Sequence, residues 1–256
     1  MNRTASFAYM QARVQARHGM RPEERVWHRL RGTTDLANYL HAARKTTLAP
    51  WVSGLHATHS THEIEHALRQ QFRDHVDRVA HWLPNRWAST IQWLTLLPDL
   101  PAMQHLLNSE AAPAWMLNNP RLRPFTSENM ATRIQAMLDS SWYDIVAAWQ
   151  GGQSPVAAWL ERWQGRWPGP TSLHTGMRYL SGLLQQQTHL TRGQPPGSTQ
   201  RQRERLAQQL QGAFRRYSFQ PAAACAHLGL FALDLERLRA ELVSRALFAD
   251  IAETGA

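Results

Sequence analysis

An apolar stripe that repeats every three or four residues constrains the fold of this chain more than any other feature. Its members are spaced by four, four, four, three and four residues: Ile64, Leu68, Phe72, Val76, Val79 and Leu83. This period places all six side chains on one face of a long α-helix. Ser60 is a preferred residue for beginning such a helix, and Pro84 ends it. Most other periodic segments repeat in the same way, and alternating runs of β-branched residues are missing. The sequence therefore predicts an all-α fold.

Prolines and glycines divide this helical pattern into three ranges. Residues 1–110 hold strongly periodic helices, residues 111–170 are interrupted by several prolines, and residues 171–256 end in two longer helices. The best internal boundary is the segment "RWPGP", which ends at Pro170. A chain of 256 residues that is 43% hydrophobic is large enough to bury a sizeable core. We therefore expect a multi-helical array of two or three small helical subdomains.

The first helix carries apolar residues on two sides. One stripe consists of Phe7, Met10 and Val14. The other stripe, on roughly the opposite side, consists of Tyr9, Ala12 and Ala16. A helix with two apolar sides is expected to be contacted from both, so the first helix is predicted to be internal.

The cysteine content and the hydropathy of the chain indicate its compartment. Cys225 is the single cysteine, so no intramolecular disulfide can form and nothing requires an oxidising compartment. The first residues turn polar before the core of a signal peptide could form. The most apolar stretch, "IQWLTLLPDLPAMQHLL", is interrupted by Pro98 and Pro101 and is not expected to span a membrane. These features predict a cytoplasmic protein.

The formal charge of +9 is carried almost wholly by arginine, because Lys45 is the only lysine. Such a charge favours an acidic protein, a nucleic acid or an anionic surface as partner. Neither G-x-x-x-x-G-K-[ST] nor G-x-G-x-x-G occurs in the sequence. These two common nucleotide-binding loops are therefore excluded.

The residues His62, Glu63 and His66 match the spacing with which zinc peptidases place two imidazoles and a general base on one helix. The longer form of this motif is not met, and a third protein ligand is hard to find, since the next glutamate after Glu65 is Glu110. The two histidines also lie away from the centre of the apolar stripe, whereas a catalytic zinc needs an enclosed cleft. We expect a capping box between Ser60 and Glu63 in place of a metal site.

Other candidate patterns have structural explanations. Cys225 and His227 are two residues apart and cannot face each other on a helix, so Cys225 is expected to be a buried small hydrophobe. Most of the eleven tryptophans recur at helical spacing and should fill the core. The segment 192–217 is basic, and Phe214 and Tyr217 are the aromatic residues that a nucleic-acid surface would use there. We expect no catalytic residues, no bound metal and no cofactor.

Five segments follow one another along the first part of the chain: "YMQARVQA" from Tyr9, "DLANYL" from Asp35, "TTLAPW" from Thr46, "IEHALRQQFRDHV" from Ile64 and, after a tryptophan-rich helix, "DLPAMQHLL" from Asp99. In this order they resemble the C/d family of A/V-type rotary ATPases, whose members are adapters on the central stalk. The segment "LDLERLRAELVSRALF" from Leu233 is loosely similar to the closing helix of that family.

The resemblance implies a funnel of helical subdomains and a role in proton or other ion transport. The protein would be a non-catalytic adapter that couples the central stalk to the membrane rotor ring, located in the cytoplasm at the inner membrane face without spanning it. Its partners would be other ATPase subunits, and no nucleic acid would be expected. Two alternatives stay open: a basic helical protein that binds nucleic acid, and a zinc hydrolase that uses His62, Glu63 and His66.

Overall fold

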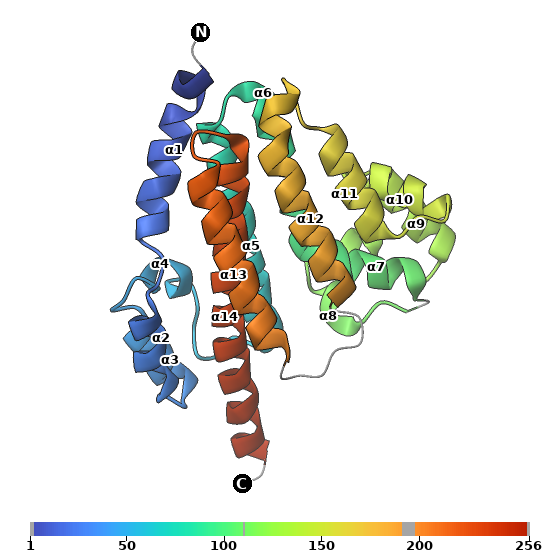
Figure 1. The fold of residues 1–256 in the computed structure, drawn as a ribbon. Coiled ribbons are helices and arrows are strands. Elements are labelled where there is room, and N and C mark those ends of the chain that lie inside the picture. The colour runs from blue at the N-terminus through green and yellow to red at the C-terminus, as the bar shows by residue number, and fades with distance from the viewer. Residues whose placement is uncertain (1–2, 110, 191–197, 255–256) are drawn as a thin grey trace.

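The computed structural model describes residues 3–109, 111–190 and 198–254, and these ranges contain helices and no strand (Figure 1). The all-α prediction is therefore confirmed. The α-helices are α1 (Arg3–Gly19), α2 (Glu24–Arg31), α3 (Leu36–Ala43), α4 (Ala49–Val52), α5 (Thr61–Trp82), α6 (Asn85–Gln92), α7 (Leu100–Asn108), α8 (Ala114–Leu117), α9 (Met130–Leu138), α10 (Tyr143–Gln150), α11 (Pro155–Gly165), α12 (His174–Leu190), α13 (Ser198–Arg216) and α14 (Pro221–Thr254). Three short 3-10 helices are η1 (Trp93–Asp99), η2 (Arg123–Phe125) and η3 (Thr171–Leu173).

Helix α5 follows its predicted pattern from end to end. All six residues of the apolar stripe are buried. The Ser60 side chain accepts from the Glu63 backbone N–H, and the Glu63 carboxylate accepts from the Ser60 backbone N–H, which together form the expected capping box. Pro84 follows the helix and prevents its continuation. The local sequence alone therefore specifies where α5 begins, where it ends and which face it buries.

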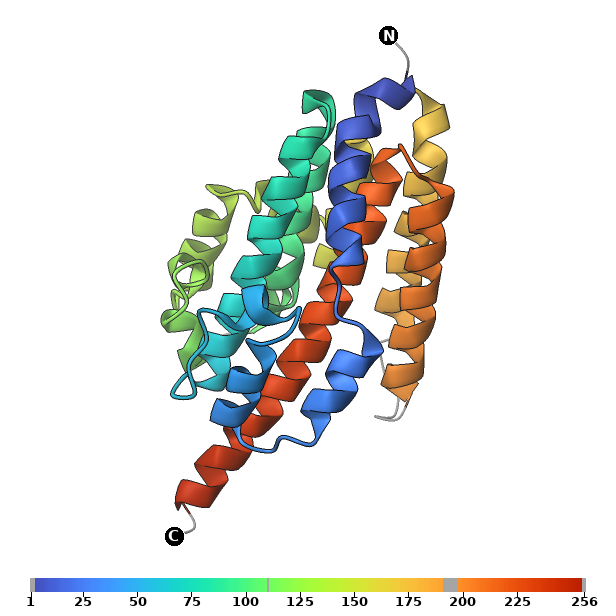
Figure 2. The ribbon, with the colours of Figure 1, turned by 90° about the vertical axis from the view of Figure 1, so that its left-hand side faces the viewer.

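Helix α14 is the long central helix, and it packs against α1, α3, α5, α12 and α13. Figure 2 shows it between α5 and α13. A run of small residues, Ala222–Ala226, lets α12 approach α14 closely. A methyl group added at Gly176 of α12 would lie 2.7 Å from the Ala222 side chain. Small side chains on both helices thus set their separation.

Buried side chains from all three sequence ranges join one hydrophobic cluster. Helices α7 to α11 lie on one side of α5 and α14, and α1 to α3 lie on the other (Figure 1). The division into ranges 1–110, 111–170 and 171–256, and the funnel of subdomains, stay predictions.

The prediction that α1 is contacted from both sides is wrong. The residues of its first stripe are buried, but those of its second stripe are exposed, Tyr9 by 56%. Two alanine methyls bury too little apolar area to require a partner, and Tyr9 lies under the Arg13 guanidinium, 5.2 Å from it. Besides the first stripe, α1 buries one polar residue among its described side chains, Gln11. The Oε1 atom of Gln11 accepts a hydrogen bond from the Phe219 backbone N–H at 2.9 Å.

Candidate functional site

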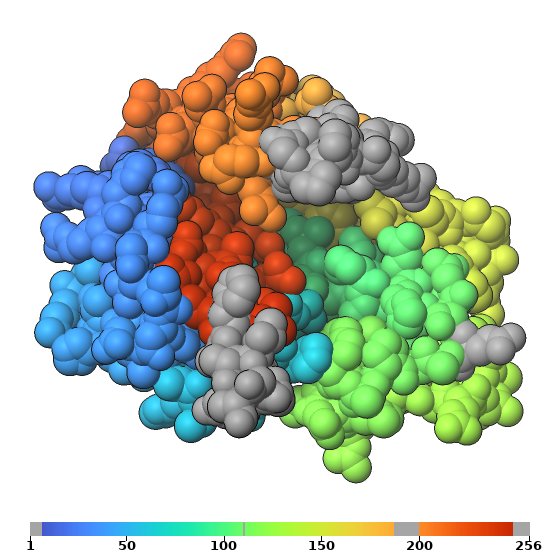
Figure 3. Space-filling model, turned by 90° about the horizontal axis from the view of Figure 1, so that it is seen from below, coloured from blue at the N-terminus to red at the C-terminus, as the bar shows by residue number. Residues whose placement is uncertain are grey.

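Two cavities meet at Leu97, and we call them together the joined recess. The larger has a volume of about 760 Å³ and lies between η1, α7, α11 and α12. The smaller has a volume of about 210 Å³ and lies between α5, η1 and α14. Leu97 lines both cavities. In the view from below, the surface is hollowed between the orange α13, the red α14 and the green α7 (Figure 3).

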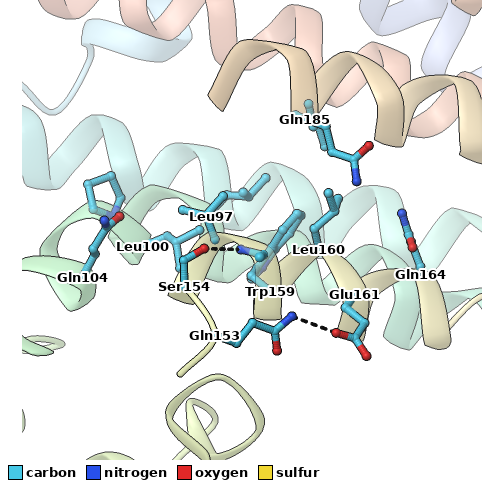
Figure 4. A pocket seen from close by; sticks show the side chains of 14 residues that line it. Leu97, Leu100, Gln104, Gln153, Ser154, Trp159, Leu160, Glu161, Gln164 and Gln185 are labelled. Atoms are coloured by element: carbon cyan, nitrogen blue, oxygen red, sulfur yellow. Dashed lines mark hydrogen bonds between the residues drawn. The ribbon is translucent and has the colours of Figure 1, made fainter. Parts of the chain in front are cut away.

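The larger cavity has an apolar floor and a rim of amides (Figure 4). Its apolar members include Leu97, Leu100, Trp159, Leu160 and Leu184, and its glutamines are Gln104, Gln153, Gln164 and Gln185. The Gln153 side-chain amide donates to the Glu161 carboxylate at 2.8 Å. This lining suits apolar side chains surrounded by peptide or side-chain hydrogen-bonding groups.

Helix α11 is fixed at this cavity by its cap and by a tryptophan. The Ser154 hydroxyl accepts from the Ala157 backbone N–H at 3.2 Å, and Pro155 occupies the first turn, where proline is tolerated. The Trp93 indole N–H donates to the Trp159 carbonyl oxygen at 3.1 Å, which ties η1 to α11. The wall of the cavity is therefore held by contacts between elements and not by one helix alone.

The smaller cavity combines an apolar floor with charges that compensate one another. Its floor includes Leu68 and Phe72 of α5. At its rim Arg239 of α14 pairs with Glu65 of α5 at 2.6 Å, and Arg69 pairs with the same carboxylate at 3.3 Å. Neither cavity lining contains histidine or cysteine. The joined recess therefore offers an apolar floor to a ligand, with a rim of amides and paired charges.

The structure places Glu63 of the peptidase-like motif in the helix cap. Its carboxylate accepts from the Ser60 backbone N–H and from the Ser60 hydroxyl, each at 2.8 Å. These hydrogen bonds, the backbone one first, lower the pKa of Glu63. His62 is exposed and stacks on Trp115, with ring centroids 5.4 Å apart. His66 is partly buried, and desolvation lowers its pKa.

No set of three or more metal-ligating side chains is placed to hold an ion within residues 3–109, 111–190 and 198–254. The capping box between Ser60 and Glu63 places the motif in the first turns of α5. His56 and His59 contact each other at a centroid distance of 5.2 Å, and His62 contacts Trp115.

The structure confirms that Cys225 is a buried small hydrophobe. Its sulfur lies 3.9 Å from the Met177 sulfur, and burial raises the pKa of its thiol to about 12. His227 contacts a different partner, since its Nε2 lies 2.8 Å from the Nε2 of His75. Sequence reasoning missed this histidine pair, because its members are 152 positions apart and no local pattern joins them.

The described part of the basic segment forms α13 and the turn residue Tyr217 after it, and Arg192 lies outside the described ranges. Its aromatic residues are turned inward, and Phe214 and Tyr217 are only 6% and 7% exposed. They are therefore not available to stack on bases. The tryptophans behave as expected, and Trp87, Trp159 and Trp163 are among the largest fully buried side chains.

The fold and the site together define an all-α protein with an apolar recess built from several separate helices. No protein-family model, curated protein or solved structure matches the chain. Within the described residues, every helix is too short or too polar to cross a lipid bilayer.

Proposed function

We propose that this chain is a non-catalytic adapter that couples the central stalk of an A/V-type rotary ATPase to its membrane rotor, and that the joined recess receives a helical segment of a stalk protein. The observation that carries the proposal is a meeting of two segments that resemble the ATPase adapter family. Residues of "IEHALRQQFRDHV" line the smaller cavity and residues of "DLPAMQHLL" line the larger one, and the two segments are joined by the buried ion pair between Arg73 and Asp99 at 2.8 Å.

The dimensions and chemistry of the joined recess support a protein segment as its occupant. A volume of about 760 Å³ lies within the usual range of roughly 300–1,000 Å³ for binding clefts, which is room for several apolar side chains but not for a whole helix. The glutamine rim can satisfy exposed peptide groups at the end of a helix. The ion-paired rim of the smaller cavity adds little net charge, so apolar contact would provide most of the affinity.

In this proposal the protein contributes shape and interface energy. Rotation would be transmitted by packed helices, while ATP chemistry and ion passage would take place in other subunits. The central helix α14 is suited to this role, because it packs along α5 and α13 and reaches the smaller cavity through Leu235 and Arg239.

Site-specific crosslinking in cells tests the proposal directly. A photoactivatable residue at Gln104, on the rim, should capture a stalk protein, whereas the same residue at Tyr143, which is 58% exposed and outside the recess, should not. Crosslinks to the ATPase from Tyr143 alone would show that the recess is not the docking site. Recovery of the native protein as a free monomer would remove the adapter assignment.

A charge placed in the recess gives a second test. Leu97→Arg should weaken the complex at least about tenfold, because the arginine would be desolvated among apolar side chains. Leu247→Arg is the matched control, since Leu247 is 50% exposed on α14. Copurified nucleic acid that is released by salt would favour the nucleic-acid alternative. Stoichiometric zinc lost in His62→Ala would favour the hydrolase alternative.

A further inference from the structure

A separate pocket of about 500 Å³ lies between α1, α4, α5 and α14. It shares no lining residue with the joined recess. Its lining includes His75 of α5, His227 of α14 and three arginines, Arg17, Arg21 and Arg78. Neither the proposed adapter role nor the sequence motifs account for this combination.

The two histidines form a buried hydrogen-bonded pair. Their Nε2 atoms are 2.8 Å apart, and the residues are 5% and 1% exposed. Burial lowers the pKa of His75 to about 3 and holds the pKa of His227 well below its usual value, so both are neutral at pH 7. One imidazole must therefore donate its Nε2–H and the other must accept.

The surroundings favour one of the two proton arrangements. The Nδ1 of His227 is buried and has no hydrogen-bond partner among the described protein atoms. A bare lone pair there costs less than an unpaired N–H. We therefore assign the shared proton to His227 Nε2, which leaves His75 with a proton on Nδ1. The His75 imidazole then has an N–H that its partner histidine does not use.

The charges that act on this pair are positive. Arg78 and Arg17 lower the pKa of His75, and Arg21 and Arg17 act on His227, as does the His18 imidazole. Arg21 is neutralised by the Asp234 carboxylate, which accepts from it at 2.6 and 2.9 Å. Arg17 and Arg78 form no ion pair with any residue that the structure describes.

Two carboxylates also line the pocket, and they act less directly on the histidines. Asp74 is exposed and accepts from the Gln70 amide at 2.8 Å. Neither Asp74 nor Asp77 is among the groups that shift the pKa of His75 or of His227. The lining thus holds three arginines and two aspartates, and two of these arginines, Arg17 and Arg78, form no ion pair within the described residues, so their guanidinium groups are available to an anion.

We infer that this pocket binds a small oxyanion, a carboxylate or a phosphate, between the guanidinium groups of Arg17 and Arg78 and the free imidazole N–H of His75. Guanidinium groups match the oxygen geometry of both anions and form charge-assisted hydrogen bonds with them. The neighbouring rings of Trp51 and Phe231 would exclude water from one side of the ligand. Such a site would link the protein to a small metabolite or ion independently of the joined recess.

Isothermal titration calorimetry of the purified full chain with inorganic phosphate and, separately, with succinate tests this inference. One saturable site for either probe is expected, and the probe that binds identifies the phosphate or the carboxylate as the ligand group. Sodium chloride of matched ionic strength should give no saturable signal. Absence of saturable binding for both probes would overturn the inference.

Charge-removing variants locate the site. Arg17→Gln combined with Arg78→Gln should weaken binding by at least about tenfold, since each removes a charge-assisted contact. Arg29→Gln is the matched control, because Arg29 is an exposed arginine of α2 outside the pocket. All three substitutions are on exposed side chains, so the variants should fold. Equal weakening in the control and the double variant would place binding elsewhere and refute the site.

Discussion

Replacing Asp99 with asparagine tests the buried ion pair that fixes η1 against α5. The Asp99 side chain is 2% exposed and the Arg73 side chain 3% exposed, and both carboxylate oxygens accept from Arg73 Nη2 at 2.8 Å. Arg121 adds a longer bond of 3.2 Å from a side chain that is 41% exposed. Because η1 also carries Leu97, this pair holds the shared wall of the joined recess.

The expected cost follows from the burial of the two charges. Asparagine preserves the shape of the side chain but leaves the Arg73 charge uncompensated, which costs about 3–5 kcal/mol for a buried pair. The bond from the more exposed Arg121 adds at most about 1 kcal/mol. We therefore expect Asp99→Asn to lower the free energy of unfolding by about 3–5 kcal/mol, a large share of the roughly 5–15 kcal/mol typical of a domain.

Urea unfolding followed by circular dichroism measures this loss. Asp144→Asn is the control, because the Arg166–Asp144 side chains are 36% and 34% exposed and their pair should contribute less than about 1 kcal/mol. Removing both charges with Arg73→Met and Asp99→Leu should cost less than the sum of the single changes. Equal losses for Asp99→Asn and Asp144→Asn would refute the reasoning.

Packing, capping and protonation give three further tests. Gly176→Ala should lower the free energy of unfolding by about 1–3 kcal/mol, because the new methyl group would lie 2.7 Å from the Ala222 side chain. Gly182→Ala of the same helix has open space around it and should raise the free energy of unfolding by about 0.5–1 kcal/mol. Denaturant melts in which both variants shift in the same direction would contradict this reasoning. Ser60→Ala should cost about 1 kcal/mol in the same assay by removing the helix cap. Burial lowers the pKa of His75 to about 3 in the folded protein, whereas the same residue in the unfolded chain takes up a proton below about pH 6.5. The free energy of unfolding should therefore decrease as the pH falls below 6.5, and it should decrease less steeply in His75→Asn. The same dependence of the free energy of unfolding on pH in both proteins would exclude His75 as the cause.

Sequence reasoning succeeded where a helix is specified by its own residues. The stripe, the cap and the proline after α5 all lie within one local segment, and each has the predicted role. The helical pair α10 and α11, joined by a turn in which Gly152 has a φ of 88°, is specified in the same local way. For α1 the sequence predicts the buried stripe correctly, but the second stripe that it predicts, Tyr9, Ala12 and Ala16, is exposed.

The joined recess could not be predicted, because long-range contacts made by charged side chains build its surroundings. Arg133 is an example: its position in a short amphipathic helix suggests a surface residue, yet the residue is fully buried. Its guanidinium donates to the carbonyl oxygens of Leu106 and Ser109, at 2.8 and 2.7 Å, near the C-terminus of α7. These carbonyls need a donor once helix bonding ends, but the sequence does not indicate which residue supplies it.

The unpaired arginines of α13 and the apolar floor of the joined recess lie on different elements, and this determines what each would contribute to docking. Helix α13, which borders the hollow in Figure 3, carries exposed arginines that form no ion pair within the described residues: Arg201, Arg205, Arg215 and Arg216. Unpaired surface charge acts mainly on the association rate and is screened over about 10 Å at 0.1 M salt. Contacts with the apolar floor act mainly on the dissociation rate. Association with a stalk protein should therefore slow as salt rises, while Leu97→Arg should speed dissociation at any salt. A dissociation rate that rose steeply with salt and ignored Leu97→Arg would place the affinity on α13 and favour nucleic acid as the partner.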